Sequence, residues 1–567
     1  MCKALMRKTL LLILAFVLMA GAVSAQVVSL SGKIVNAETQ EPVPFAHLQI
    51  KGSAVGTSSN LEGDFDLKLR ARYLNDQQGL LISCIGYVSS EIRLSSGINP
   101  SLTVSLTPSL KSLDEVVING TIEKKQYDDR ARRIAQKAIR RIPQNYIKSE
   151  SMGRAFYRHY CAENDTYVRL IEAALDVYRS GKEPYRSVIP EDNLGFRVNQ
   201  LRRSFDFTAS SKLKHPPFSL NFLLSNDMTA YEYQNPLLTH FNAVDFWIQD
   251  TTSYESEEVL VIGYFTDQGG TLRNRSYTGQ LFINMRNFAI LQHEATESYE
   301  SNYPTEGTRY RLDKKVQYLS YRGKHYLNRV TSDLTAEYFQ YDSLGTTIDS
   351  LVHTSHIELI NTELVFDDLE PALGGEPQQQ QLINIDYDST FWRDYTVLQA
   401  TSLEEKIIND LSEKLAIEQQ FALYNQLLEG GGSIIDSDAF QNMASKYKGQ
   451  PTYFILWSAN RYPSLLDLIP KGYFKRQIKK GKAKLVLVGL GMDELRWLNR
   501  RDAHLLNQKH ITHERLNYQL DKDIYEELYN DVLPYSLLTD PAGKIVTNSP
   551  AVPSDKLMKE VLKEMRK

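Results

Sequence analysis

The stretch "KKVQYLSYRGKHYLNRVTSDLTAEYF" (Lys314–Phe339) decides how the largest part of this chain folds. It contains two runs rich in Val, Leu, Thr and Tyr, which are residues that favour β-strands. The dipeptide Arg322-Gly323 separates the two runs and is the expected turn of a β-hairpin. The stretch therefore predicts two long antiparallel strands that are neighbours in one sheet.

The surrounding residues 151–395 repeat this pattern, and much of the chain's high tyrosine content, 33 residues against 4 Trp, fits half-buried strands. Further strands are expected in "EEVLVIGYF" (257–265) and "YTGQLFINMRNFAILQHEAT" (277–296). Successive antiparallel strands predict a meander that curls into a half-barrel. The second stretch resembles sheets of envelope lipoprotein-carrier proteins, which implies an apolar ligand in the concave face. The alternative is a face filled by a structural core.

The N-terminus has the pattern of a secretory signal. Lys3, Arg7 and Lys8 precede the apolar run "TLLLILAFVLMAGAV", and "VSA" before Gln26 supplies the small residues of a cleavage site. Residues 1–25 are therefore expected to be a signal peptide, with an uncleaved membrane anchor as the alternative. Removing them changes the formal charge from −4 to −7, since the segment has three basic and no acidic residues. An acidic chain of this kind is not expected to bind nucleic acid.

Residues 27–107 alternate with period two between Gly, Asn and Pro turns, which predicts an antiparallel β-sandwich of about seven strands. Gly56 and Gly63 suit turns that need positive φ, and Phe65 and Leu67 are expected to point inward. "SGKIVNAETQEPVPFAHLQIKGSAVGTSSNLEGDFDLKL" (31–69) resembles the carboxypeptidase-D regulatory-like domain. That resemblance implies a module that precedes TonB-dependent receptors and other envelope proteins of Gram-negative bacteria of the Bacteroidota type. It implies no peptidase activity.

Two segments are expected to be helices that connect domains. "KKQYDDRARRIAQKAIRRIPQNY" (124–146) has Ile134, Ala138 and Ile142 on one face, and its basic residues lie largely elsewhere. The segment Ser402–Gly432 is predicted to be a long helix that begins with a capping box formed by Ser402 and Glu405. Three glycines end it before the last domain.

Residues 433–567 alternate strand and helix signals and end in a hairpin, which is a thioredoxin-like order. The words "KGQPTYFILWSA", "VLVGLGMDELRWL" and "LPYSLLTDPAGKIV" resemble envelope thiol-disulfide oxidoreductases. The resemblance implies that Pro534, after Leu533, is the cis-proline of that family. It also places a hairpin at Asp540, Gly543 and Lys544.

This domain lacks the cysteine pair of the family. Aligning Trp457 with the family tryptophan puts Arg461 and Ser464 at the two cysteine positions, with Tyr462 and Pro463 between them. A shift by one residue puts Tyr462 and Leu465 there instead. Thiol-disulfide exchange needs a thiolate, so neither alignment supports that chemistry.

The turn and the cis-proline loop of the family are still expected here, without the cysteines, and they form the candidate binding site. Trp457, Arg461, Tyr462, Pro463, Ser464, Leu533 and Pro534 are expected to form a surface for extended peptide or for an anion. A relic kept only for folding is the alternative. No catalytic residue, no metal site and no cofactor are predicted, because "HITH" (His510–His513) lacks a third ligand in register.

The expected architecture is multidomain α+β: a signal peptide (1–25), a regulatory-like β-sandwich (26–109) and a linker with an amphipathic helix (110–150). A curved antiparallel β-domain (151–400), a helical linker (401–432) and a degenerate thioredoxin-like α/β domain (433–567) follow. The favoured function is a non-catalytic envelope binding or scaffold protein, periplasmic or associated with the outer membrane, whose partner is an envelope protein or peptide. The alternatives are a thiol-disulfide enzyme that uses Cys84 or Cys161, which could also pair as a disulfide, and a carrier of lipid or another apolar ligand.

Overall fold

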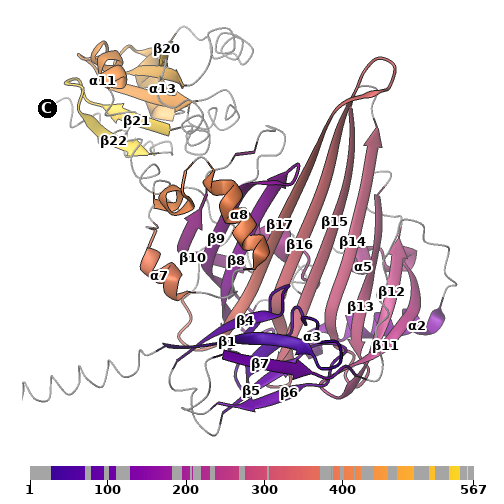
Figure 1. The fold of residues 1–567 in the computed structure, drawn as a ribbon. Coiled ribbons are helices and arrows are strands. Elements are labelled where there is room, and N and C mark those ends of the chain that lie inside the picture. The colour runs from indigo at the N-terminus through magenta and orange to yellow at the C-terminus, as the bar shows by residue number, and fades with distance from the viewer. Residues whose placement is uncertain are drawn as a thin grey trace, which may run out of the picture.

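In the part of the chain that the structure describes, strands dominate and form four sheets, with short helices beside them (Figure 1). The computed structural model describes residues 27–70, 78–94, 101–109, 128–181, 194–204, 207–208, 219–229, 236–266, 275–302, 306–370, 385, 387–395, 401–413, 415–422, 438–457, 469–470, 472–490, 510–516, 535–549, 559 and 563. The expected signal peptide lies outside these residues. No helix within the described ranges is both long enough and apolar enough to span a bilayer.

The N-terminal part is a sandwich of seven strands in two sheets, ordered β4-β1-β7 and β3-β2-β5-β6. The strands are β1 (Val27–Asn36), β2 (His47–Ile50), β3 (Gly56–Ser58), β4 (Asp64–Arg70), β5 (Gly79–Ser83), β6 (Ser90–Arg93) and β7 (Ser101–Leu106). The strand number is as predicted, but the sandwich is not wholly antiparallel. Strand β1 pairs with β7 in parallel, because a crossover through the second sheet separates them in the chain.

The two glycines that we expected in turns have different roles. Gly63 has φ +77° and sits in a turn, as predicted. Gly56 lies in β3 without a positive φ, and a Cβ there would meet the backbone oxygen of Leu48 at 2.3 Å. It is therefore needed for close approach of two strands and not for a turn. Phe65 and Leu67 are buried, as their alternation predicts.

The central part is one ten-stranded sheet in the order β10-β9-β8-β17-β16-β15-β14-β13-β12-β11, and every neighbouring pair is antiparallel. Its strands are β8 (Ser151–Glu163), β9 (Thr166–Arg179), β10 (Leu194–Arg203), β11 (Asp245–Tyr254), β12 (Glu257–Thr266), β13 (Arg275–Asn284), β14 (Ile290–Asn302), β15 (Glu306–Tyr321), β16 (Lys324–Tyr341) and β17 (Thr347–Val365). The predicted β15–β16 hairpin turns at Arg322 and Gly323, with φ of +50° and +75°. The meander is closed by β17 pairing back onto β8, which joins its two halves.

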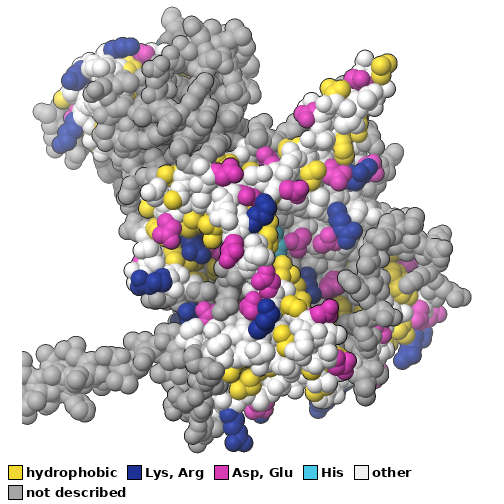
Figure 2. All heavy atoms as spheres, viewed as in Figure 1, with side chains coloured by type: hydrophobic (Ala, Val, Ile, Leu, Met, Phe, Trp, Pro, Cys, Tyr) yellow, Lys and Arg dark blue, Asp and Glu magenta, His cyan; other side chains and the backbone are white. Residues whose placement is uncertain are grey.

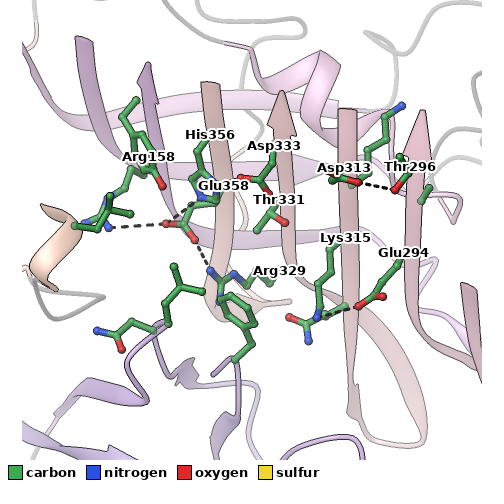
Figure 3. Close-up of a pocket in the computed structure, with 18 of the residues that line it drawn as sticks. Arg158, Glu294, Thr296, Asp313, Lys315, Arg329, Thr331, Asp333, His356 and Glu358 are labelled. Atoms are coloured by element: carbon green, nitrogen blue, oxygen red, sulfur yellow. Dashed lines mark hydrogen bonds and ion pairs between the residues drawn. The ribbon is translucent and has the colours of Figure 1, made fainter. Parts of the chain in front are cut away.

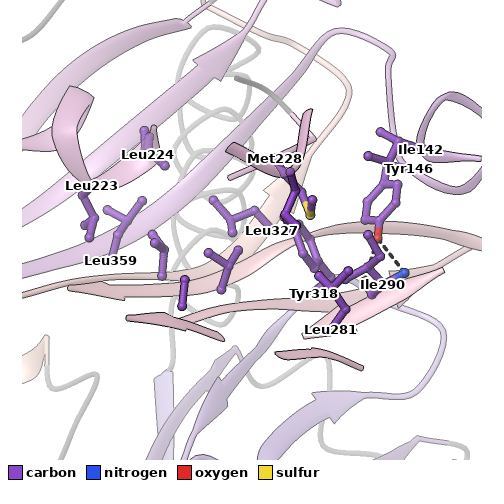
Figure 4. Close-up of a cluster of buried hydrophobic side chains, with 14 of the residues drawn as sticks. Ile142, Tyr146, Leu223, Leu224, Met228, Leu281, Ile290, Tyr318, Leu327 and Leu359 are labelled. Carbon is purple, nitrogen blue, oxygen red and sulfur yellow. Dashed lines mark hydrogen bonds between the residues drawn. The ribbon is translucent and has the colours of Figure 1, made fainter. Parts of the chain in front are cut away.

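One face of this sheet, here called the core face, is covered by helices and is filled by apolar side chains (Figure 4). The covering helices are α2 (Asp129–Arg140), α3 (Ile142–Asn145), α4 (Leu220–Leu224) and α5 (Pro236–Thr239). Helix α2 starts where the Asp128 carboxylate accepts hydrogen bonds from the backbone N–H groups of Arg130 and Ala131. The predicted face packs on the sheet: Ala138 and Ile142 are buried, and Ile134 is partly buried against the same core. Ala131 and Ala135 are buried as well.

The opposite face, here called the polar face, is covered only at its ends. The sandwich packs at one end through hydrogen bonds such as Leu364 N–H to the Ala54 carbonyl and Gly86 N–H to the Ser253 carbonyl. At the other end lie α7 (Ser389–Asp394) and α8 (Ser402–Ser412), with Ile407 and Leu411 packed against Leu170 of β9.

Helix α8 differs from the long connecting helix that we expected. It ends at Ser412, and it packs onto the sheet. Its capping box is formed by Thr401 and Glu404, one residue earlier than the predicted pair. A helix held by apolar contacts to β9 belongs structurally to the sheet that it covers.

The C-terminal part is a five-stranded sheet in the order β20-β19-β18-β21-β22. Strands β18 (Thr452–Trp457), β19 (Lys484–Leu490) and β20 (Ile511–Leu516) run parallel, and β21 (Tyr535–Thr539) and β22 (Ile545–Ser549) form an antiparallel hairpin beside β18. Helices α11 (Asp438–Ser445) and α13 (Gly472–Lys479) accompany them. The strand–helix–strand unit and the hairpin turn at Asp540 and Gly543 are as predicted.

The Tyr146 hydroxyl gives a test of how the core face is held. It donates to the Ile290 carbonyl at 2.6 Å and accepts from the Ile290 N–H at 3.0 Å, both in a buried setting. Because both bonds disappear together, Tyr146→Phe should lower the free energy of unfolding by about 1–3 kcal/mol. Urea titration followed by circular dichroism measures this. Tyr341→Phe, at the hairpin end of β16, is the matched control, and an equal effect of both variants would show that the bonds are not stabilising.

Candidate functional site

The site described on the polar face is an open cavity of about 580 Å³ lined by three separate parts of the chain. Strands β8 and β13 to β17 form its floor. The sandwich contributes Phe45, Asn60 and Leu61. The start of helix α8 contributes Thr401, Leu403 and Glu404. Figure 2 shows Lys or Arg and Asp or Glu side chains intermixed over this face of the molecule.

A cross-strand row of five charged residues and one threonine runs along the floor. Successive strand pairings place Glu172, Arg158, Glu358, Thr331, Lys315 and Glu294 side by side on β9, β8, β17, β16, β15 and β14. Period-two alternation explains the row, because the residues on either side of each member point to the core face. Opposite charges face each other between β9 and β8, between β8 and β17 and between β15 and β14, so the register of these strand pairs and the site favour one another.

Arg158 is the centre of the buried part of this row. Its side chain is 7% exposed and contacts Glu172 at 2.8 Å, Glu404 at 2.5 Å and Glu358 at 3.9 Å. Burial would lower the pKa of Arg158, but the three carboxylates raise it above its ordinary value. Because Glu404 belongs to α8, this ion pair also attaches the helix to the sheet.

Glu358 is held as a carboxylate. Burial alone would raise its pKa, but Arg329 at 2.7 Å and His356 lower the pKa of Glu358 far below its ordinary value. A carboxylate in this state is a poor proton donor and a poor general base at neutral pH.

His356 is held in the protonated form. Burial would lower its pKa, but the hydrogen bond with Asp333 at 2.5 Å and the nearby Glu358 raise the pKa of His356 to about 9. The ring also stacks on Tyr160, with ring centroids 4.9 Å apart. Figure 3 shows His356, Asp333 and Glu358 lying together at the floor of the cavity.

Phe45 of the sandwich reaches into the cavity through an unusual backbone conformation. Its φ is +60°, a region that non-glycine residues occupy at a cost of about 1–3 kcal/mol. The ring lies over the Arg329 guanidinium at 4.1 Å and 5.3 Å from Lys315 Nζ. Cation–π attraction of this kind offsets part of that cost.

A hydrogen-bonded clasp joins the sandwich to α8 across the rim of the cavity. The Glu62 carboxylate accepts from the Ser402 hydroxyl at 2.7 Å and from the Ser402 N–H at 3.2 Å. These bonds lower the pKa of Glu62. The clasp and the Arg158–Glu404 pair hold the first turn of α8 from two sides.

The candidate residues predicted from the sequence fall elsewhere. Trp457 ends β18 and is fully buried in the core of the C-terminal sheet. Arg461, Tyr462, Pro463, Ser464, Leu533 and Pro534 lie outside the described residues, so the peptide- or anion-binding turn remains a prediction. Sequence reasoning did not find the charged cavity. One signal in the sequence could have indicated it. Along β8 and β17, Arg158 and Glu358 occupy every-second positions between residues that face the apolar core.

The cavity bears on the alternative of an apolar ligand in the concave face of the sheet, which stays a prediction. Its lining includes five acidic and five Lys or Arg side chains, which an apolar ligand would have to desolvate. The apolar core face, for its part, is filled by the helices packed on it.

Cys84 and Cys161 are both free thiols, so the disulfide considered above is not formed. Burial raises the pKa of the Cys84 thiol to about 11. Cys161 is fully buried, with its Sγ 3.3 Å from His159 Nε2. Neither environment favours an accessible thiolate.

Comparison with known proteins adds the family of the N-terminal part. Residues 30–118 match the CarboxypepD_reg-like domain, as the sequence resemblance implied. TonB-dependent receptor P3 of Formosa agariphila is 26% identical over 144 residues, which are 25% of this chain and 14% of the receptor. TonB-dependent receptor SusC of Bacteroides thetaiotaomicron is 31% identical over 123 residues, which are 22% of this chain and 11% of the receptor. The chain thus matches only a small part of each relative's length, and the likenesses fit a protein of the cell envelope.

Solved structures with thioredoxin domains are also similar to this chain. The thioredoxin domain of a thiol-disulfide oxidoreductase from Bacteroides vulgatus is 20% identical and covers 21% of this chain and 83% of its own, at a TM-score of 0.16. A TM-score this low carries no argument about fold. The thioredoxin-like order of the C-terminal part rests instead on its own strand directions.

The elevated pKa of His356 predicts a pH-dependent contribution to stability. A folded-state pKa of about 9 against an ordinary 6.5 means that protonated His356 stabilises the fold at low pH, and that this contribution is lost as the pH rises through 9. His356→Gln should therefore be destabilising near pH 6, and its deficit should shrink by about 3 kcal/mol towards pH 10. Urea titrations of both proteins across this range measure the difference. His510→Gln, at an exposed position, is the control, and a deficit independent of pH would contradict the assignment.

The thiol of Cys84 provides a second pH test. With a pKa of about 11, it should react with iodoacetamide far more slowly than a free thiol at neutral pH, and its rate should rise towards pH 11. Mass spectrometry of the alkylated peptide follows the rate. Fast labelling at neutral pH would revive the thiol-enzyme alternative.

Proposed function

We propose that this chain is an exported, non-catalytic binding protein of the cell envelope, and that the cavity between sandwich, sheet and α8 is its principal site. The observation that carries the proposal is that three segments far apart in the sequence line one charged cavity. Concave sites of a few hundred cubic ångströms with convergent polar groups are the usual form of small-ligand sites.

The protonation states of the cavity support binding over catalysis. Glu358 is locked as a carboxylate and His356 as an imidazolium, so neither group is poised to exchange a proton near neutral pH. The carboxylates of Glu404, Glu294 and Asp333 each face a cationic partner at 3.0 Å or less. Side chains that pair with one another in this way hold the shape and the charge pattern of the cavity constant, and specific binding of a ligand requires both.

The envelope location is supported by the N-terminal domain and by the likeness to the two TonB-dependent receptors. From these we infer an exported protein in the periplasm or on the inner side of the outer membrane. The C-terminal part is proposed as a second recognition surface around the turn after Trp457, where Arg461 would favour an anion. A relic without a partner remains the alternative for that part.

A rim substitution tests the proposed site without disturbing the core. Leu61 borders the cavity and is 57% exposed, so Leu61→Glu should fold normally while adding a negative charge at the mouth. After cross-linking in the native envelope, the amount of partner or ligand recovered with this variant should be about tenfold lower than with the wild type. A tenfold drop corresponds to a loss of about 1.4 kcal/mol in binding free energy. Quantitative mass spectrometry of the purified complexes gives the ratio.

Leu344→Glu is the matched control, because Leu344 is 88% exposed at the β16–β17 turn, away from the cavity. The same material recovered with all three proteins would mean that the cavity is not the binding site.

A further inference from the structure

Two buried side chains in the cavity have polar atoms without a partner. Arg329 on β16 is 5% exposed and Gln317 on β15 is 6% exposed, and the two are directly opposite each other in the strand register. Among the residues that the structure describes, Arg329 Nε and Nη1 and Gln317 Oε1 make no hydrogen bond. Both residues line the cavity.

The remaining atoms of these side chains are held firmly. Arg329 Nη2 donates to Glu358 at 2.7 Å, and the Phe45 ring covers the guanidinium at 4.1 Å. Gln317 Nε2 donates to the Gln292 side-chain oxygen at 2.9 Å. The three unpaired atoms have almost no accessible surface of their own, so a ligand reaches these positioned donors and this positioned acceptor only with a small shift of the side chains that cover them. Leaving such buried groups unpaired is costly, so a ligand that pairs both regains that free energy.

The charges around this pair select the kind of ligand. The donors belong to a cation and suit a negatively charged acceptor. Glu358, Glu294 and Asp313 line the cavity together with Lys315 and Arg311, so its charges are nearly balanced and one added negative charge disturbs that balance less than two would. The acceptor of Gln317 requires an N–H or O–H on the same ligand, close to the anionic group.

From this arrangement we infer that the cavity binds the carboxylate end of a peptide or of an N-acyl amino acid. The terminal carboxylate accepts hydrogen bonds from Arg329, and the amide N–H of the same residue donates to Gln317 Oε1. Phe45, Leu61 and Leu403 border the cavity and offer apolar contact to the terminal side chain. This inference rests on the proposed binding function and specifies its ligand class.

The decisive experiment compares matched ligands on the full-length mature protein. In isothermal titration calorimetry, N-acetyl-Ala-Phe with a free carboxylate should bind at least about tenfold more tightly than its C-terminal amide, a difference of about 1.4 kcal/mol. Inorganic phosphate, which lacks the N–H, should compete poorly. Equal affinity for acid and amide, no binding of either, or stronger binding of phosphate would overturn the inference.

Two variants then locate the contact. Gln317→Met removes the acceptor at similar size and should weaken binding of the acid about fivefold, a loss of about 1 kcal/mol. Arg329→Lys should abolish the preference for acid over amide. Arg309→Gln is the control, since Arg309 is a half-exposed arginine of the same sheet that pairs with Glu300 and Glu337 outside the cavity. If Arg329→Lys does not fold, the affinity of Gln317→Met and the comparison of acid with amide on the wild type still test the inference.

The ligand class and the proposed function can fail separately. If Leu61→Glu lowers the amount of bound material but the protein does not prefer the acid over the amide, the cavity is still a binding site and only the ligand class is rejected.

Discussion

The buried ion pairs of Arg158 constrain the rest of this structure more than any other interaction. Removing an arginine and its carboxylates from water costs several kcal/mol per ion, and only close geometry with full pairing repays it. Arg158 obtains its partners from β9, β17 and α8, which lie apart in the sequence. The sheet must therefore pair β8 with β17, and the chain must return after the sheet to place Glu404. A fold that met only one of these conditions would leave a charge buried without its partner.

The same requirement explains why the polar face is covered at its ends and open in the middle. At one end, α8 supplies both a carboxylate and apolar contacts through Ile407 and Leu411. At the other, the sandwich supplies Phe45, whose ring covers the Arg329 guanidinium. Between these covers the charged row meets a cavity in place of a packed core. The pairing of the buried charged side chains of the sheet thus also determines the shape and the charge pattern of the site.

Sequence periodicity was enough for the local elements and insufficient for the site. The Arg322-Gly323 hairpin, the seven sandwich strands and the C-terminal strand–helix–strand unit follow from alternation and turn residues that act over short distances. The meeting of Arg158 with Glu358 does not, because it depends on β17 returning to β8, and no local pattern specifies that pairing. Helix α8 shows the opposite case: its periodic apolar residues predicted a long connecting helix, but the helix ends at Ser412 and packs on β9. The contribution of Phe45 was equally hidden, since nothing in "PVPFA" predicts a positive φ at a phenylalanine.

The pairing of β8 with β17 has a consequence for how this chain reaches its native state. Hydrogen-bonded partners across this seam, such as His159 and Ser355, are 196 residues apart, so the contact closes a very long loop. Folding rates fall as such distant contacts become more important. When the chain emerges from its N-terminus onward, β8 presents an unpaired edge until β17 has followed it. Exposed edges of this kind pair readily with other chains, so the protein is prone to aggregate in the interval between the emergence of these two strands.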